Sequence, residues 1–337
     1  MKLVRILPFV CLIGAAIVVG QSSKNTFTVP LGLTPILWPK ENPYSVEKAE
    51  LGRLLYFDKR LSADNTVACA SCHAPEKGFT DQLPVSLGIR GQKGGMSAPT
   101  VINRGYGMLQ FWDGRANSLE AQAVGPIANP IEMGHTHEGV VRDLQKIAGY
   151  REHFKKAFGT DEINIDRVAK AIATFERTVV SGNSPYDKYR AGNKKALSAS
   201  QIRGLDVYFN KAKCDACHEG PNFTANSFHN LGVGSQKATP DVGRFAVTKD
   251  PADWGAFKTP TLREIANTAP YMHDGSLATL EEVVDYYDKG GVKNKNLDER
   301  LKPLNLTAQE KKDLVEFMKS LSGEGWQHLT APKSFPQ

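Results

Sequence analysis

The sequence predicts an all-α fold made of two domains with long loops. Apolar residues recur at helical spacing behind several capping boxes, and no stretch shows a convincing strand pattern. A five-residue motif also occurs once in each half, as Cys69-Ala70-Ser71-Cys72-His73 and Cys214-Asp215-Ala216-Cys217-His218. At 337 residues the chain is long enough for two domains of ordinary size, each with its own core.

The repeated motif is the attachment signature of c-type haem. Two thiols one helical turn apart can add to the two vinyl groups of a haem, and the following imidazole can bind the iron. A zinc site would need a second Cys or His pair at zinc spacing, and a thioredoxin-like pair would lack the histidine. The motifs therefore predict two covalently bound haem c groups, held by Cys69, Cys72 and His73 and by Cys214, Cys217 and His218.

Residues 1–20 have the pattern of a signal peptide. Lys2 and Arg5 precede an apolar run from Ile6 to Val19 that is short for a bilayer span, and Gly20 offers a cleavage point. The alternative is an uncleaved N-terminal anchor. A signal peptide predicts a periplasmic protein, which fits c-type haem attachment outside the bacterial cytoplasm. The net charge of +6 comes without a clustered Lys/Arg run, which argues against a nucleic-acid partner.

The predicted elements follow in order along the chain. Residues 21–43 are rich in Pro, Ser and Gly and form an extended lead-in. An N-terminal haem domain over 44–192 begins with a helix near Ser45 and closes with an amphipathic helix through residues 168–179. Between them, residues 75–104 are dense in Gly and Pro and are expected to form irregular loops over the haem.

A linker over 183–193 leads to the C-terminal haem domain, 193–337. Capping boxes at Ser198, Thr279 and Thr307 predict the starts of three helices in this domain. The first of these helices runs directly into the second haem motif. Residues 220–259 are again expected to be irregular.

Further short motifs surround the two haem motifs in a fixed order along the mature chain. They are Leu51-Gly-x-x-Leu55-Tyr-Phe-Asp58, Gly78-Phe-Thr-Asp81, Ala98-Pro-Thr100, Phe111-Trp-Asp-Gly-Arg115, Gly243-Arg-Phe245 and Ala269-Pro-Tyr-Met-His-Asp-Gly275. In this order the sequence resembles the bacterial dihaem cytochrome c peroxidase family, which includes the MauG-type enzymes. The resemblance implies two cytochrome-c-like domains and an iron-dependent oxidoreductase.

The resemblance also implies roles for particular residues. The N-terminal haem would react with hydrogen peroxide, and the C-terminal haem would accept electrons from a small c-type cytochrome or a cupredoxin. Glu132 would move a proton between the two peroxide oxygens, with Gln122 and Pro126 lining the same pocket. Trp112 would lie between the haems and relay oxidising equivalents. Members of this family are often dimers, so a homodimer is one expected assembly.

The loop before Ala98 departs from the activation-dependent peroxidases. Those enzymes carry a histidine there that occupies the sixth site of the peroxidatic haem, whereas this chain has Ile89 and no histidine in residues 86–100. We therefore expect a five-coordinate N-terminal haem that is open to peroxide without prior reduction. Met96 in the same loop is the alternative ligand, although a thioether would close the active site.

The resemblance to the family gives two opposing indications about calcium binding. Thr268 and Pro270 match backbone-carbonyl ligands of a calcium ion between the domains. Ser97, however, stands where the family usually has a calcium-binding asparagine.

A second departure concerns the far side of the C-terminal haem. Activation-dependent peroxidases have a methionine fourteen residues after the histidine that corresponds to His273, and this chain has Tyr287 there, beside Tyr286. Tyrosine is the MauG-type arrangement, and a tyrosinate ligand would stabilise ferric iron. The alternative is that both tyrosines only pack on a helix face, since Tyr287 shares a stripe with Leu280 and Val283.

Three functions remain to be separated. The first is a periplasmic peroxidase that reduces hydrogen peroxide to water with electrons from a small redox protein. The second is a MauG-type enzyme that uses peroxide to oxidise a residue of a partner protein. The third is a non-enzymatic dihaem electron carrier, which the open iron and Glu132 disfavour because a carrier gains nothing from either.

Overall fold

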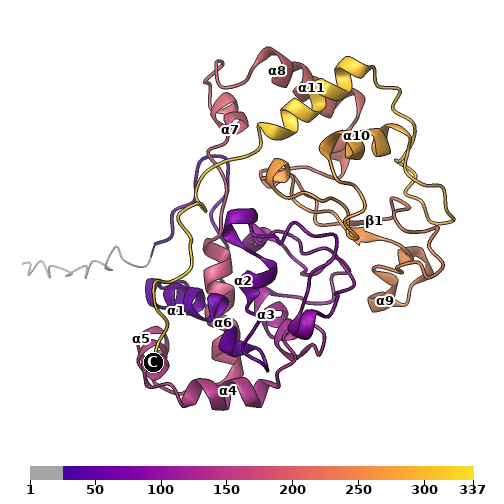
Figure 1. The fold of residues 1–337 in the computed structure, drawn as a ribbon. Helices are drawn as coiled ribbons and strands as arrows, with labels where there is room; N and C mark the ends of the chain where they lie inside the picture. Colours follow the sequence, from indigo (N-terminus) through magenta and orange to yellow (C-terminus); the bar gives the residue numbers. More distant parts are fainter. Residues whose placement is uncertain (1–25) are drawn as a thin grey trace, which may run out of the picture.

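The computed structural model describes residues 26–337 and shows a helical protein with little strand and long loops (Figure 1). This confirms the helical class. The predicted signal peptide lies outside the described residues. Within residues 26–337, no helix has the length and apolar character needed to cross a membrane. Residues 26–43 contain no helix or strand, as expected for the lead-in.

The first half holds six α-helices among the residues described, and the helices of each half lie together in Figure 1. Those of the first half are α1 (Val46–Phe57), α2 (Cys69–Cys72), α3 (Leu119–Ala128), α4 (His137–Gln145), α5 (Ala148–Phe158) and α6 (Ile165–Thr178). The rest of the chain adds α7 (Pro185–Arg190), α8 (Ala199–Asp206), a π-helical turn (Val207–Lys211), α9 (Phe245–Thr248), α10 (Leu280–Asp288) and α11 (Ala308–Lys319).

The first half is organised around the crossing of α1 and α6. Gly52 lies so close to the Ala171 carbonyl and to Phe175 that any side chain at position 52 would collide with α6. This contact places Tyr56, one turn further along α1, where its hydroxyl donates a 2.8 Å hydrogen bond to the His73 carbonyl. The helix pair therefore holds the first haem motif in place.

The second half repeats this arrangement with α8 and α11. Gly204 lies against the Asp313 carbonyl and Phe317 in the same way. Tyr208, four residues after that glycine, donates a 2.5 Å hydrogen bond to the carbonyl of His218. The two halves thus share one local design, Gly-x-x-x-Tyr-Phe followed by the haem motif, with a closing helix packed on the glycine.

The two halves meet through a reciprocal pair of backbone hydrogen bonds. The amide of Ser97 donates to the His273 carbonyl at 2.8 Å, and the amide of Lys258 donates to the Trp112 carbonyl at 2.8 Å. Ser97 and Lys258 each stand two residues before the proline of an x-Pro-Thr turn, and Trp112 and His273 each precede an Asp-Gly pair. The contact is therefore pseudo-symmetric and joins equivalent parts of each half.

The sequence prediction is confirmed for some elements and differs for others. The capping boxes at Ser198, Thr279 and Thr307 are confirmed. The predicted linker, 183–193, contains a short helix, α7, that the sequence prediction did not include. A two-stranded antiparallel sheet, β1 (Phe228–His229) with β2 (Phe257–Lys258), lies within residues 220–259, which were expected to be irregular. Two-residue strands show no alternation, so no sequence pattern could reveal them.

A buried ion pair ties α7 to the second half. Arg263 is 1% exposed, and its guanidinium donates to both carboxylate oxygens of Asp187 at 2.8 and 2.9 Å. We expect Arg263→Met to lower the free energy of unfolding by about 3–5 kcal/mol, because it leaves a buried carboxylate unpaired. Urea titration measures this change. Lys170→Met, which removes an exposed ion pair with Asp166 on α6, should change it by less than about 0.5 kcal/mol.

Candidate functional site

A single cavity of about 580 Å³ connects the two Cys-x-x-Cys-His motifs. All six motif residues predicted to hold haem line it, namely Cys69, Cys72, His73, Cys214, Cys217 and His218. The four cysteines form no disulfide. Burial raises the pKa of each thiol, so the thiols are uncharged at neutral pH. The structure thus brings both motifs to one internal space.

The two histidines of the motifs lie in apolar surroundings. Burial lowers the pKa of His73, against the opposing charge of Asp81 and the nearby carbonyls of Phe79 and Pro99. Burial likewise lowers the pKa of His218 to about 4. A neutral imidazole is the form that binds a metal, so both rings are ready to act as ligands.

Glu132, Gln122 and Pro126 all line the wall of the cavity. Gln122 and Pro126 come from α3, and Glu132 follows in the turn after this helix. Asn129 Nδ2 donates a 2.6 Å hydrogen bond to Glu132 Oε1 and fixes the carboxyl group. Burial raises the pKa of Glu132, although the hydrogen bond from Asn129 and the charge of Arg115 oppose this shift. The arrangement offers a positioned carboxyl group that exchanges its proton at a higher pH than an exposed glutamate would.

The loop that lacks the histidine packs directly on the Glu132 turn. The amide of Ile89 donates a 2.8 Å hydrogen bond to the Glu132 carbonyl, and the Ile89 side chain is 3% exposed. The histidines that line the cavity among residues 26–337 are His73, His218, His229 and His273. His229 is bound to Asp298 at 2.7 Å, and no histidine comes from the loop over Glu132.

Trp112 lies on the cavity wall where the two halves meet. Its indole Nε1 donates a 2.9 Å hydrogen bond to the Ser97 carbonyl, while its own carbonyl accepts from Lys258 of the other half. Opposite this contact, the ring of His273 stacks on Phe257 with ring centroids 3.6 Å apart. These hydrogen bonds hold Trp112 at the contact between the two halves.

Tyr287 and Tyr286 differ in their surroundings. Tyr287 lines the cavity, whereas the Tyr286 hydroxyl donates a 2.8 Å hydrogen bond to the Leu231 carbonyl. Tyr287 stands eight residues after the N-cap of α10, and Pro126 stands eight residues after the N-cap of α3. The same face of each helix therefore points into the cavity, so Tyr287 stands toward the second motif as Pro126 stands toward the first.

Comparisons with known proteins agree with this geometry. Residues 46–195 match the family model described as di-haem cytochrome c peroxidase. The methylamine utilization protein MauG of Methylorubrum extorquens is 43% identical over 85% of this chain and 81% of its own length. This chain belongs to the di-haem cytochrome c peroxidase family.

Other members of the family extend the comparison. The cytochrome c551 peroxidase of Nitrosomonas europaea is 42% identical over 84% of this chain and 82% of its own length. Among solved structures, a MauG-like protein associated with microbial copper homeostasis superposes with a TM-score of 0.85 at 36% identity, covering 92% of this chain and 99% of that one. Membership of the family makes this protein an oxidoreductase that acts on hydrogen peroxide, with haem c as its cofactor.

The cavity of this family member fits such a cofactor. The Lys258 side chain lines the cavity at 4% exposure, and burial lowers its pKa well below the usual value, helped by the charge of Arg104. A buried lysine keeps its charge only beside an anionic partner, and a haem propionate would supply one. Neither Lys258 nor Arg104 belongs to a haem motif, so no sequence pattern indicates a role for them, and only the fold brings them to the cavity.

The proposed calcium ligands also lie on the cavity wall. Thr268 and Pro270 both line it, next to the second half's Tyr271. Within residues 26–337, no group of three or more His, Cys, Asp or Glu side chains forms a metal site. Backbone carbonyls are not part of such a group, so calcium binding at Thr268 and Pro270 stays a prediction.

Proposed function

We propose that this protein reduces hydrogen peroxide at a haem held by His73, with electrons entering through a haem held by His218. The observation that carries this proposal is the single cavity that joins both motifs and has Glu132 on one side of its wall. Two haem sites without an acidic side chain beside either of them would suit an electron carrier. A fixed carboxyl group with a raised pKa beside one site favours peroxide chemistry instead.

The bound haems would supply redox-active iron and electrons for cleavage of the peroxide O–O bond. Glu132, as a carboxylate, would accept the proton of the inner peroxide oxygen and return it to the outer oxygen, which leaves as water. The hydrogen bond from Asn129 would hold the carboxyl group in position through both transfers. Gln122 would offer a further polar contact, and Pro126 would keep the wall of the pocket rigid.

The Ile89 loop supports activity without prior reduction. Its backbone is bonded to the Glu132 turn and its side chain is buried in the core, so the loop brings no imidazole to the peroxide pocket. Met96 lines the cavity and stays the alternative sixth ligand. Its neighbour Ser97 is held at the contact between the halves by Trp112 and His273.

The remaining assignments are part of the same proposal. We infer two cytochrome-c-like domains over 44–192 and 193–337, each with thioether bonds from its two motif cysteines to one haem. Trp112 would relay oxidising equivalents between them, because a fixed indole between two sites shortens each electron transfer. The protein would be exported to the periplasm by its signal peptide and could assemble as a homodimer.

A MauG-type activity is the second candidate. Tyr287 faces the cavity while Tyr286 is engaged with a backbone carbonyl, which favours Tyr287 as the ligand of the second haem. The MauG-like structure and MauG relatives add to this reading. In this case peroxide would oxidise a residue of a partner protein, and no small electron donor would be needed.

The test is stopped-flow absorbance of the oxidised holoprotein mixed with one equivalent of hydrogen peroxide and no reductant. We expect a rapid Soret change. Its decay upon addition of a reduced small cytochrome or cupredoxin would support peroxide removal, and persistence would support protein oxidation. No Soret change would overturn reduction-independent activity and would point to Met96 as a sixth ligand.

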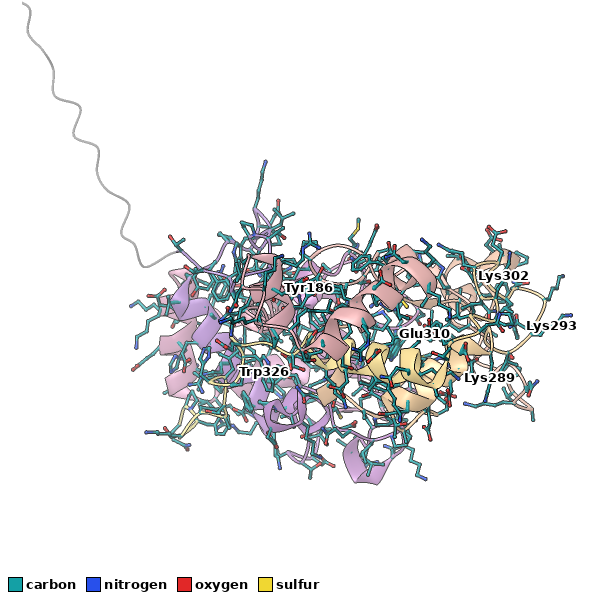
Figure 2. All side chains as sticks on the ribbon, turned by 90° about the horizontal axis from the view of Figure 1, so that it is seen from above. Tyr186, Lys289, Lys293, Lys302, Glu310 and Trp326 are labelled. Carbon is teal, nitrogen blue, oxygen red and sulfur yellow. The ribbon has the colours of Figure 1, made fainter. Side chains whose placement is uncertain are left out.

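The end of the second half offers a basic surface for an electron donor. Lys213, Arg300 and Lys302 line the cavity near His218, and the lysines are exposed. Figure 2 shows Lys289, Lys293 and Lys302 at the same end of the molecule. We therefore expect an acidic donor protein.

Charge reversal on this surface should slow electron delivery. For Lys293→Glu with Lys302→Glu, we expect the second-order rate with a reduced acidic cupredoxin to fall roughly tenfold at low salt, because electrostatic steering is lost. The wild-type rate should fall with added salt and the variant rate should not. The matched control is Lys155→Glu with Lys156→Glu, on exposed residues of α5. Equal losses in both double variants would contradict a docking surface here.

A further inference from the structure

The two halves differ at one buried position that faces the cavity. Glu176 on α6 directly follows Phe175, and Met318 on α11 directly follows Phe317. These two phenylalanines are the equivalent residues that pack on the glycines of α1 and α8. Glu176 and Met318 are each 6% exposed and both line the cavity. The first half therefore carries a carboxyl group where the second half carries a thioether.

A second position shows the same asymmetry. Arg104 follows Asn103, whose φ is 61°, and Ile265 follows Glu264, whose φ is 62°, in equivalent turns after x-Pro-Thr. Both Arg104 and Ile265 line the cavity. The polar pair Glu176 and Arg104 is thus confined to the half that holds His73.

Glu176 is not compensated by a neighbour. Its Oε2 is buried without a hydrogen-bond partner. The guanidinium of Arg177 is already engaged with Glu120 at 2.7 and 2.9 Å, and Arg104 donates to Gln110 at 2.6 Å. An ionised carboxylate in this position would be costly, so the neutral acid is favoured. Burial raises the pKa of Glu176 to about 8, against the charges of Arg177 and Arg104 and with that of Glu120.

The other titratable and charged groups that face Glu176 do not change their charge near neutral pH. They are Tyr56 of α1, Cys69 of α2, Arg104 of the turn after Asn103, Glu120 of α3 and Arg177 of α6 itself. Burial raises the pKa of the Tyr56 phenol and the Cys69 thiol, so both stay neutral. The Arg177 ion pair keeps Glu120 ionised, because its hydrogen bonds outweigh the effect of burial on the Glu120 pKa. Glu176 is therefore the member of this group that can change charge near neutral pH.

We propose that Glu176 releases a proton when the haem held by His73 is oxidised and takes one up when it is reduced. In the oxidation, one electron leaves the haem and one proton leaves the Glu176 carboxyl group for bulk water. The carboxylate so formed offsets the positive charge gained by the iron, and the attraction is strong in a poorly solvated site. The other half has Met318 and Ile265 in these places and lacks such a group. This inference needs the haem at His73 but does not depend on the peroxide reaction.

The test is a spectroelectrochemical titration of the holoprotein between about pH 6 and about pH 9, with each haem followed separately. A tenfold change in proton concentration corresponds to about 59 mV for a one-electron couple linked to one proton. We expect the midpoint potential of the His73 haem to fall with rising pH by up to this slope. The potential of the His218 haem should be nearly independent of pH.

Two substitutions separate coupling from a structural role. Glu176→Gln keeps the shape but cannot ionise, so the slope of the first haem should vanish. Met318→Glu places an acid at the equivalent position, so a slope should appear at the second haem. Glu176→Met, which copies the second half, provides a further variant if glutamine disturbs haem incorporation.

Glu132 is the competing explanation, because it also lines the cavity and has a raised pKa. The slope of the first haem should persist in Glu132→Gln. An unchanged slope in both Glu176 variants, or its loss in Glu132→Gln alone, would overturn the inference. A wild-type protein without any slope at the first haem would overturn it as well.

Discussion

Replacement of Glu132 by glutamine is expected to slow the reaction of the oxidised protein with hydrogen peroxide by about 10²–10⁴-fold. General acid–base catalysis contributes a factor of this size, and an amide can neither accept nor return the peroxide proton. Glutamine keeps an Oε1 atom, so it can still accept the 2.6 Å hydrogen bond from Asn129. The measurement is the second-order rate of the Soret change after mixing with peroxide.

A matched control separates this effect from a general loss of charge. Glu138→Gln makes the same chemical change on the exposed surface of α4, six residues away, and should leave the rate unchanged. A Glu132→Gln rate within a factor of about three of wild type would exclude Glu132 as the proton-transferring group, given the usual size of such catalysis.

The pH dependence provides a second check on Glu132. Because the group must be ionised to accept a proton, the wild-type rate should be full above the Glu132 pKa and should fall as the pH drops through it. Burial raises this pKa, so the fall should occur at a higher pH than for an exposed glutamate. In Glu132→Gln the rate should lose this dependence.

The sequence predicted those structural features that depend on residues within one helical turn of each other. The capping boxes at Ser198, Thr279 and Thr307 start helices because each side chain satisfies backbone groups within one turn. Residues 119–128 were missed as a helix, since Gly125 and Pro126 act as helix breakers in a sequence pattern. In the structure, Ser118 caps the N-terminus of α3, and packing of the helix compensates for Gly125 and Pro126.

Contacts between residues far apart in the chain could not be predicted from local sequence patterns. Glu176 stands beside the apolar stripe of α6, where a charged residue is normally exposed, and the contact with the cavity follows only from packing. An alignment of the two halves of the chain with each other could have singled out Glu176. The pairs Gly52 with Gly204 and Phe175 with Phe317 fix the register of the two halves, and in that register Glu176 stands opposite Met318.

Tyr287→Phe is expected to raise the midpoint potential of the second haem by about 0.1 V or more. Axial ligands tune haem potentials over about 0.8 V, and an anionic oxygen ligand stabilises the ferric state. Burial raises the pKa of Tyr287, so a phenolate at this position requires a cation beside it, and a haem iron would provide one. Spectroelectrochemistry of the holoprotein measures the shift, and the peroxide reaction at the first haem should keep its wild-type rate.

Tyr286→Phe is the control for this prediction, because the two residues are adjacent on α10 and lose the same hydroxyl group. Tyr286 bonds to the Leu231 carbonyl, so its substitution should lower stability slightly and leave both potentials unchanged. If neither substitution moves the second potential, Tyr287 only packs against Leu280 and Val283 on the inner face of α10. The second haem would then lack a tyrosinate ligand, and the case for the MauG-type activity would lose its structural basis, whereas peroxide reduction at the first haem would stand.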